Sequence, residues 1–360
     1  NEILKKQAEY MKNFIGEDSL AARLHADRFA MCMPRIRFDE DLINEAITGI
    51  QEAFKNSSFH MHIFVGVYDI HDVEERVSIM CDKANLASET IKNEYKSSVA
   101  YYTEHLLEKS IEERKIIGEF DRALDNEEFV MFLQPQVDVS GKPFGSEALV
   151  RWQHPDKGLL APGVFIDVLE KTGFVYRLDR YMWDKAVKQL AEWKKRGIND
   201  YHISVNISTK DFYLIDVYET FVGLIDPKLL KLEITETALM SDFNKNMVII
   251  KRLQKYGFDI EIDDFGSGYS SLNMLKDISA DVLKIDMGFL RASENEVKGQ
   301  DILESIIGLA NKLGMRVITE GVEKKTQVDM LYDMGCKMFQ GYYFSKPIPV
   351  DEFEKKYNIG

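Results

Sequence analysis

Polar side chains that are suited to catalysis end successive β-branched or aromatic runs in the last two-thirds of the chain. They are Glu147, Asn206, Glu233, Asp263 with Asp264, Lys284, Glu320 and Gln340. Strands in soluble domains usually end in turn residues such as Gly, Pro and Ser. Acids and amides repeated at these points therefore indicate that several strand ends meet at one shared site.

Five of these side chains are carboxylates, and carboxylates that share a site repel one another. Two ionised acids about 4 Å apart repel by roughly 4 kcal/mol at an effective dielectric constant near 20, so protons or cations must lie between them. Oxygen ligands suit Mg²⁺ or Mn²⁺, and Asn206 adds a carbonyl oxygen. Two such ions activate a water and stabilise the leaving oxygen of a phosphodiester. Lys284 is suited to donate to that water or to developing phosphate charge. The residues predict a metal-dependent phosphate-ester hydrolase.

Each signal taken alone also fits an ordinary structural role. A single Glu at a strand end is most often a surface or capping residue, and residues 263–268 fit a capping turn. That segment lacks the third glycine of a phosphate-binding loop. His154 before Pro155 is typical of a turn. His60 and His62 share a strand face but have no third ligand at metal-binding spacing.

Strands and helices alternate regularly after about residue 119. We expect strands at residues 129–139, 144–152, 201–207, 229–235, 259–264, 281–286, 316–320 and 337–340. A Ser-Gly-Lys-Pro turn separates the first two, which predicts an antiparallel pair. We expect helices at residues 174–196, 241–256, 296–313 and 326–334, each followed within a residue by glycine. This pattern predicts an α/β fold, a (β/α)8 TIM-like barrel with one antiparallel strand. A doubly wound open sheet is the alternative, but it would not bring seven strand ends together.

The first hundred residues have a different pattern. Helices are expected at residues 2–14, 39–54 and 73–95, around strands at 29–33 and 59–68. This predicts a small α+β domain. Residues 99–120 read as a charged helix that bridges to the barrel. We set the domain limits at 1–100, with a helical linker at 101–118 and the barrel domain at 119–360.

Composition limits the possible partners and location. The chain has 46 Lys and Arg against 60 Asp and Glu, a formal charge of −14, which argues against binding long nucleic acid or anionic membranes. No apolar stretch is long enough to span a membrane. The three isolated cysteines indicate free thiols in a reducing cytoplasm. The chain begins at Asn1 without a signal sequence, so we expect a fragment that an upstream sensor or anchor can precede.

The motifs resemble those of a known family. Glu147-Ala-Leu-Val-Arg151-Trp, followed by His154-Pro155, is similar to the signature of EAL-domain cyclic-di-GMP phosphodiesterases. The resemblance covers roughly residues 119–355, with all blocks in family order. The further blocks are Gln134-Pro, Val-Asn206-Ile-Ser, Leu-Glu233-Ile-Thr-Glu236, Asp263-Asp264-Phe-Gly-Ser-Gly-Tyr-Ser-Ser-Leu, Leu-Lys284-Ile-Asp286, Thr-Glu320-Gly-Val-Glu and Gln340-Gly-Tyr-Tyr-Phe-Ser-Lys-Pro.

The resemblance implies a role for each matched residue. One Mg²⁺ or Mn²⁺ ion is held by Glu147, Asn206, Glu233 and Asp263, and a second by Asp263, Asp264 and Glu320. Catalysis is assigned to Glu147, Asp263, Lys284 and Glu320, with Lys284 orienting the nucleophilic water. Substrate contacts are assigned to Gln134, Arg151, Asp286 and Gln340. Glu236 steadies the loop that follows Asp264. Met287 replaces an Arg that is usual in the family, but it touches no implied ligand.

The implied activity is hydrolysis of cyclic-di-GMP to linear pGpG by a two-metal-activated water, in a domain that commonly forms a homodimer. The alternative is a catalytically silent cyclic-di-GMP receptor, a role that relatives adopt after losing catalytic residues. None of the ligand residues is lost here. A third possibility is a phosphodiesterase acting on short RNA or another cyclic dinucleotide.

The first domain resembles the GGDEF domain of diguanylate cyclases in a degenerate form. Of the five signature letters only Asp27 and Phe29 remain, and His25 and Ala26 replace the glycines that allow close approach of a nucleotide. Arg28 stands where a metal-binding Glu is required. The chain also starts too late for the first strand of such a domain. We expect no cyclase activity, and a regulatory domain that binds GTP or a protein partner.

Overall fold

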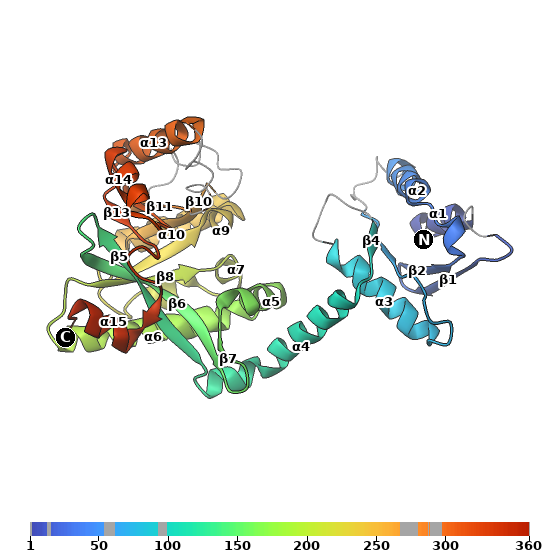
Figure 1. Ribbon diagram of the computed structural model, residues 1–360, viewed down its shortest axis with the longest axis horizontal. Coiled ribbons are helices and arrows are strands. Elements are labelled where there is room, and N and C mark those ends of the chain that lie inside the picture. The colour runs from blue at the N-terminus through green and yellow to red at the C-terminus, as the bar shows by residue number, and fades with distance from the viewer. Residues whose placement is uncertain are drawn as a thin grey trace. The chain divides into compact units, whose positions relative to one another are not determined.

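The chain forms two compact units, residues Asn1–Lys115 and Ile116–Gly360. Figure 1 shows the computed structural model, which describes residues 2–12, 16–53, 62–92, 99–266, 280–286, 288 and 297–359. Helix α4 (Glu104–Asp125) runs across the division and occupies most of the predicted linker. The predicted domain limits themselves stay a prediction. Among the described residues, no helix has both the length and the apolar character needed to cross a bilayer.

The second unit is a closed eight-stranded barrel. Around the barrel the strands follow the order β5, β13, β12, β11, β10, β9, β8 and β6, and β6 pairs again with β5. Their bounds are β5 Phe129–Asp138, β6 Pro143–His154, β8 His202–Ile207, β9 Leu230–Thr235, β10 Ile260–Phe265, β11 Val282–Ile285, β12 Arg316–Thr319 and β13 Met338–Phe339. Strand β5 is antiparallel to both neighbours, whereas the other pairings around the barrel are parallel. The predicted barrel with one antiparallel strand is confirmed.

Helices lie around the outside of the strands (Figure 1). The longer ones are α6 Val175–Lys195, α10 Phe243–Tyr256, α13 Val297–Lys312 and α14 Lys325–Asp333, close to the predicted limits. The shorter elements were not predicted, because a few residues carry no helical or strand period. They are β7 Gly158–Leu160, η2 Pro162–Val164, α5 Ile166–Thr172, α7 Asp211–Leu214, α8 Val217–Phe221, α9 Glu236–Met240, β14 Ile348–Pro349 and α15 Val350–Tyr357.

Local sequence explains where the main helices begin and end. The side chain of Asp242 accepts a hydrogen bond from the backbone N–H of Lys245 and so caps α10. Gly257 ends that helix with a positive φ of 124°, a conformation that costs other residues more. Helix α6 buries Met182, Ala186 and Leu190 along one side, at the four-residue spacing of an amphipathic helix.

The inner face of the barrel is polar, and the outer face is apolar. Side chains alternate along a strand, and the register sets Glu261 of β10 beside Glu233 of β9, and Ile260 beside Leu232. Ile260 and Leu232 are fully buried within the apolar core. The pleat therefore turns the acids of these strands into the barrel, where they are shielded from water.

The first unit contains helices and short strands. Its elements are α1 Glu2–Lys12, β1 Leu20–His25, β2 Arg28–Cys32, η1 Arg35–Arg37, α2 Glu40–Ala53, β3 Val65–Val67, α3 Val77–Thr90 and β4 Val99–Tyr101. Strands β1 and β2 form an antiparallel hairpin, and β3 pairs in parallel with β4. Strands β1 and β4 were not predicted, and the helix expected at residues 73–95 is shorter at both ends. Part of the strand expected at residues 59–68, with His60, lies outside the described residues.

A buried pair of acids joins α6 to the segment that follows β8. Ser208 donates to Asp211 Oδ2 from its backbone N–H (2.7 Å) and its hydroxyl (2.8 Å). Burial, followed by the charge of Asp211, raises the pKa of Asp179 on α6 well above its usual range, and burial raises the pKa of Asp211 as well. One turn along α6, Trp183 donates its indole N–H to the backbone oxygen of Asn206 (2.9 Å). These contacts fix the position of Asn206.

We predict that Asp179→Asn stabilises the protein, and that the gain grows with pH. At low pH both acids are protonated in the folded and unfolded states. As pH rises through the ordinary Asp range, the unfolded chain ionises while folded Asp179 keeps its proton, so the wild type loses stability. An amide keeps the donor without ionising, so we expect the gain in stability at pH 8 to exceed the gain at pH 5 by at least about 1 kcal/mol. Urea unfolding at pH 5 and pH 8 measures it.

The matched control for this substitution is Glu192→Gln, an exposed carboxylate on the same helix, which should change stability little at either pH. A gain for Asp179→Asn that is equal at pH 5 and pH 8 would contradict the raised pKa. A loss of stability at pH 8 would contradict it as well.

Candidate metal centre at the mouth of the barrel

The ammonium group of Lys284 lies at the centre of an acidic cluster at the carboxyl ends of the parallel strands, the mouth of the barrel. The side chain is fully buried on β11. Four carboxylate oxygens surround Nζ, and they belong to Glu320 (2.7 Å), Asp263 (3.0 Å), Glu233 (3.1 Å) and Glu147 (3.4 Å). Residues that are up to 173 positions apart in the numbering thus meet around one cation. The structure brings these predicted site residues together.

A turn at the end of β10 brings two consecutive acids to the same cluster. Neighbouring strand residues normally point to opposite faces. The φ of Asp264 is +55°, and the register of β10 with β11 shifts between Ile262 and Phe265. One ligand oxygen each of Asp263, Asp264 and Glu320 consequently lie within 4.8 Å of one another. Strained backbone of this kind costs about 1–3 kcal/mol and is concentrated at functional sites.

Amide side chains hold Glu147 in place. Asn206 donates from Nδ2 to Glu147 Oε1 (3.1 Å), and Gln340 donates from Nε2 to Glu147 Oε2. Gln340 Nε2 is also 3.4 Å from the side-chain oxygen of Gln134, whose own amide donates to the backbone oxygen of Ser345 (3.3 Å). Gln134 and Gln340 are both buried. Of the two amides predicted to contact substrate, Gln340 therefore contacts Glu147 directly, and Gln134 contacts Gln340.

The remaining predicted residues lie around this cluster. Arg151 is on β6, four residues beyond Glu147 and on the same face. Its guanidinium lies 5.5 Å from the ring centre of Phe132 and donates to the backbone oxygen of Val150. Asp286 follows β11, is partly exposed, and accepts the backbone N–H of Gly288 (2.6 Å).

Glu236, the residue expected to steady the loop after Asp264, is the first residue of α9 and is buried. That loop, residues 267–279, lies outside the described residues, as does Met287.

The pKa values of the acids show that the cluster lacks positive charge. Burial, followed by the charge of Glu147, raises the pKa of Glu233 well above its usual range. Burial also raises the pKa of Glu320 well above its usual range, and it raises the pKa of Asp263. In both cases the charge of Lys284 acts in the opposite direction, but burial outweighs it. Burial and Asp263 raise the pKa of Asp264 to about 6.

Glu147 is the exception among the five acids. Burial would raise its pKa, but Lys284 and the hydrogen bonds from Gln340 and Asn206 outweigh burial and lower it.

This donor set fits divalent cations. The five carboxylates and Lys284 together carry a formal charge of −4, which two divalent ions would neutralise. Glu233 Oε2 is buried and has no hydrogen-bond partner among the described residues, although buried polar atoms are normally paired. Ligand atoms that are all oxygen suit Mg²⁺ or Mn²⁺ rather than metals that prefer sulfur or imidazole.

Comparison with known proteins agrees with this geometry. Residues 117–347 match the sequence model of the EAL domain. The chain belongs to the EAL domain family. The match begins inside α4, so it leaves the GGDEF resemblance of the first unit a prediction.

Two relatives illustrate the similarity of this EAL protein to longer proteins. The signaling protein YkoW of Bacillus subtilis is 31% identical over 99% of this chain and 46% of its own length. The bifunctional diguanylate cyclase/cyclic di-GMP phosphodiesterase MucR of Pseudomonas aeruginosa is 30% identical over 97% of this chain and 53% of its own length. The chain spans about half the length of these relatives.

A solved structure matches the EAL domain directly. The MucR phosphodiesterase in complex with cyclic-di-GMP is 34% identical and superposes with a TM-score of 0.63, over 66% of this chain and 99% of that one. The overlap and the shared fold place the barrel of this chain among EAL domain structures.

Three buried polar residues of the EAL barrel were not predicted from the sequence. Gln136, His202 and Glu261 are buried on the inner face, one layer below the strand ends. The alternation Asp-Ile-Glu-Ile-Asp at residues 259–263 was the available signal. This alternation indicated that Glu261 shares the inner face of β10 with Asp263.

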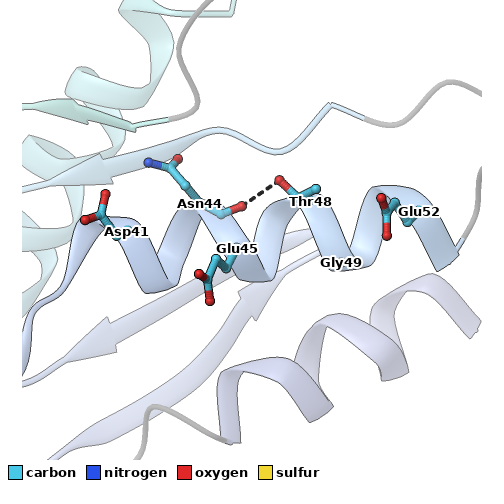
Figure 2. Close-up of a pocket in the computed structure, with 6 residues that line it drawn as sticks. All are labelled: Asp41, Asn44, Glu45, Thr48, Gly49 and Glu52. Carbon is cyan, nitrogen blue, oxygen red and sulfur yellow. Dashed lines mark hydrogen bonds between the residues drawn. The ribbon is translucent and has the colours of Figure 1, made fainter.

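A hollow elsewhere on the surface has no comparable chemistry. Figure 2 shows the exposed face of α2 in the first unit, where the hollow has a volume of about 590 Å³ and is lined by Asp41, Asn44, Glu45, Thr48, Gly49 and Glu52. Its acidic side chains all belong to α2 and extend away from the helix, and the Thr48 hydroxyl donates to the backbone oxygen of Asn44. This arrangement is that of a solvated helix face.

We predict that Lys284→Met destabilises the cation-free EAL protein by about 3–5 kcal/mol, because buried carboxylates lose the one ammonium at their centre. Added Mg²⁺ or Mn²⁺ should recover part of the loss, since bound cations replace the missing charge. Urea unfolding with a chelator and then with each cation measures both effects.

The control variant is Lys312→Met, which removes an exposed ammonium at the end of α13. It should change the free energy of unfolding by less than about 0.5 kcal/mol. If Lys284→Met were as stable as this control in the presence of the chelator, the central role of the Lys284 charge would be refuted.

Proposed function

We propose that this protein is a divalent-cation-dependent phosphodiesterase that hydrolyses cyclic-di-GMP to pGpG. The observation that carries the proposal is the cluster of five carboxylates at the mouth of an EAL barrel, of which four surround buried Lys284 and the fifth, Asp264, lies beside Asp263 and Glu320. Relatives named as cyclic di-GMP phosphodiesterases support it, as does the structure of a similar EAL domain bound to cyclic-di-GMP. Every ligand position that the family resemblance implies is occupied by the expected residue type.

The acids and one amide would hold the cations. Glu147, Asn206, Glu233 and Asp263 are assigned to one ion, and Asp263, Asp264 and Glu320 to the other, so Asp263 is shared. When bound, Mg²⁺ or Mn²⁺ ions supply Lewis acidity, which lowers the pKa of water and neutralises phosphate charge.

Lys284 acts as a charged hydrogen-bond donor, not as a base. Burial alone would lower its pKa, but Asp263, Glu147 and the other acids outweigh burial and raise the pKa well above its usual range. The ammonium therefore keeps its proton and can orient the attacking water through a hydrogen bond. Glu320 Oε1 is 2.7 Å from Nζ and is assigned to accept a proton of that water.

The reaction breaks one P–O3′ bond of the cyclic dinucleotide. The water oxygen bonds to phosphorus, and the departing 3′ oxygen takes a proton, which leaves linear pGpG with a 5′ phosphate. Arg151 is assigned to pair with a substrate phosphate. No ion-pair partner of Arg151 occurs within the described parts of the chain, so its charge is available. Asp286 is assigned to contact substrate at the partly exposed rim, and Gln134 and Gln340 to keep Glu147 in position.

The first unit is assigned a regulatory role. Its hairpin turn retains a positive φ of 49° at Ala26, where glycine is the favoured residue. Arg28, at the position of a metal-binding Glu, pairs with Glu89 at 3.3 Å. A cation bound to a neighbouring acid cannot serve as a metal ligand. A homodimer formed through the EAL domain and a cytoplasmic location complete the proposal.

We predict that the purified protein converts cyclic-di-GMP to pGpG with Mg²⁺ or Mn²⁺ and that a chelator stops the reaction. Glu147→Gln and Asp263→Asn remove ligand charge and should lower kcat by more than about 100-fold, while Glu192→Gln should leave it unchanged. Chromatographic identification of the product measures turnover. Tight binding of cyclic-di-GMP without pGpG would instead support the receptor function.

We predict no diguanylate cyclase activity from the first unit. The glycines that allow close approach of a nucleotide are His25 and Ala26 here, and Arg28 replaces a metal ligand. Incubation with GTP and Mg²⁺ or Mn²⁺, followed by separation of the nucleotides, should yield no cyclic-di-GMP. Because the EAL domain would hydrolyse that product, the assay uses Glu147→Gln. Any accumulation of cyclic-di-GMP or pGpG refutes the prediction.

A further inference from the structure

A chain of hydrogen bonds runs inward from the acidic cluster to a buried histidine. Gln136 on β5 is fully buried, and its Nε2 donates to Glu233 Oε1 (3.4 Å). The other end of the same amide, Oε1, is 3.1 Å from His202 Nε2 on β8. Gln136 therefore bridges a predicted cation ligand and a histidine that none of the proposed catalytic steps uses.

The hydrogen-bond donors in this chain have one consistent direction. The amide oxygen of Gln136 can only accept, so His202 Nε2 carries a proton and donates it. Burial, followed by the charges of Lys231 and Arg316, lowers the pKa of His202 well below its usual range, so the ring is neutral. With Oε1 directed to His202, the amide nitrogen of Gln136 must face Glu233.

Packing fixes the histidine ring in this orientation. Its ring centre lies 5.8 Å from that of Phe144, with the two planes inclined at 41°. A Cβ atom added at Gly145, which is level with His202 in the β6–β8 register, would lie 2.0 Å from His202 Nε2. The absence of a side chain at residue 145 thus makes room for the ring.

The chain of hydrogen bonds distinguishes the two oxygens of Glu233. Oε1 accepts the hydrogen bond from Gln136 Nε2 and lies 3.1 Å from Lys284 Nζ. Oε2 is buried and has no hydrogen-bond partner among the described residues. We propose that His202 and Gln136 are positioning residues that orient Glu233 so that its Oε2 atom serves as a cation ligand. By doing so they set the affinity of the site for divalent cations. This inference rests on the proposed function.

Other residues of the same layer do not share this role. Ser204 on β8 is also fully buried on the inner face, but its hydroxyl donates to Glu261 Oε2 (2.9 Å) and not to Glu233. Ser204→Ala therefore removes one buried hydrogen bond from the same layer without touching the Gln136 chain. It is a matched control for general loss of interior polarity.

The test measures the Kd of Mn²⁺ by calorimetry or by the spin-resonance signal of free Mn²⁺, without substrate. Gln136→Met keeps side-chain length and loses the donor, and His202→Phe keeps a ring and loses the donor. Each should weaken Mn²⁺ binding by about 10- to 100-fold, the usual effect of losing a group that orients a metal ligand. Ser204→Ala should bind like the wild type, and His202→Gln, which retains a donor, should restore most of the affinity lost in His202→Phe.

Two further readouts separate positioning from damage to the fold. The Mn²⁺ concentration for half-maximal turnover should rise in Gln136→Met, while kcat at saturating Mn²⁺ stays within a few-fold of the wild type. The double variant Gln136→Met/His202→Phe should bind no more weakly than Gln136→Met alone, because His202 acts through Gln136. Circular dichroism verifies folding, and the His202 variants provide the test if Gln136→Met does not fold.

The outcomes distinguish this inference from the proposed function. If the wild type binds Mn²⁺ and both Gln136→Met and His202→Phe bind it equally well, the positioning role is refuted and the phosphodiesterase proposal stands. If the effects of the two single variants add in the double variant, the action of His202 through Gln136 is refuted. If the wild type binds no Mn²⁺, the proposed function fails, and the inference fails with it.

Discussion

The structure of the second unit depends on negative charge held inside a closed barrel. Buried charges are costly unless they are paired, yet Glu147, Glu233, Asp263 and Glu320 share one lysine. The raised pKa values of most of these acids reflect that imbalance. Interiors of such barrels are usually filled by Val, Ile and Leu. A polar interior of this kind is stable only with protons or cations, so cation binding is expected to raise the folding stability of this unit.

The outer face of the sheet compensates for the polar interior. Leu232, Ile234, Ile260 and Ile262 alternate with the inner acids on β9 and β10 and are fully buried in the apolar core. At about 25 cal/mol per Å² of buried apolar surface, this layer between strands and helices supplies the main stabilisation. Because strand side chains alternate, one pleated sheet provides both an apolar support and a polar site.

The sequence predicted the barrel and the main acids because both follow from short-range patterns. Strand and helix periods and the glycines after helices locate the elements, and closure of a barrel brings the strand ends together whatever the detailed packing. It did not reveal the left-handed turn at Asp264, which aligns two consecutive acids. Nor did it reveal Gln136 and His202, because their contact depends on the register of strands that are far apart in sequence. The very short helices lack a period to detect.

The one reversed strand has a specific consequence for the site. The parallel strands β8 to β13 bring their carboxyl ends to the mouth, whereas β6 continues past Glu147 to His154. Strand β5 runs the other way and passes the mouth near its middle, with Gln134 opposite Glu147 and Gln136 opposite Gly145. Two amides spaced two residues apart thus face the interior at successive depths. Gln134 contacts Gln340, which holds Glu147, and Gln136 holds Glu233. The antiparallel strand therefore adds neutral donors to a ring of acids, which orients two predicted cation ligands without adding or removing charge.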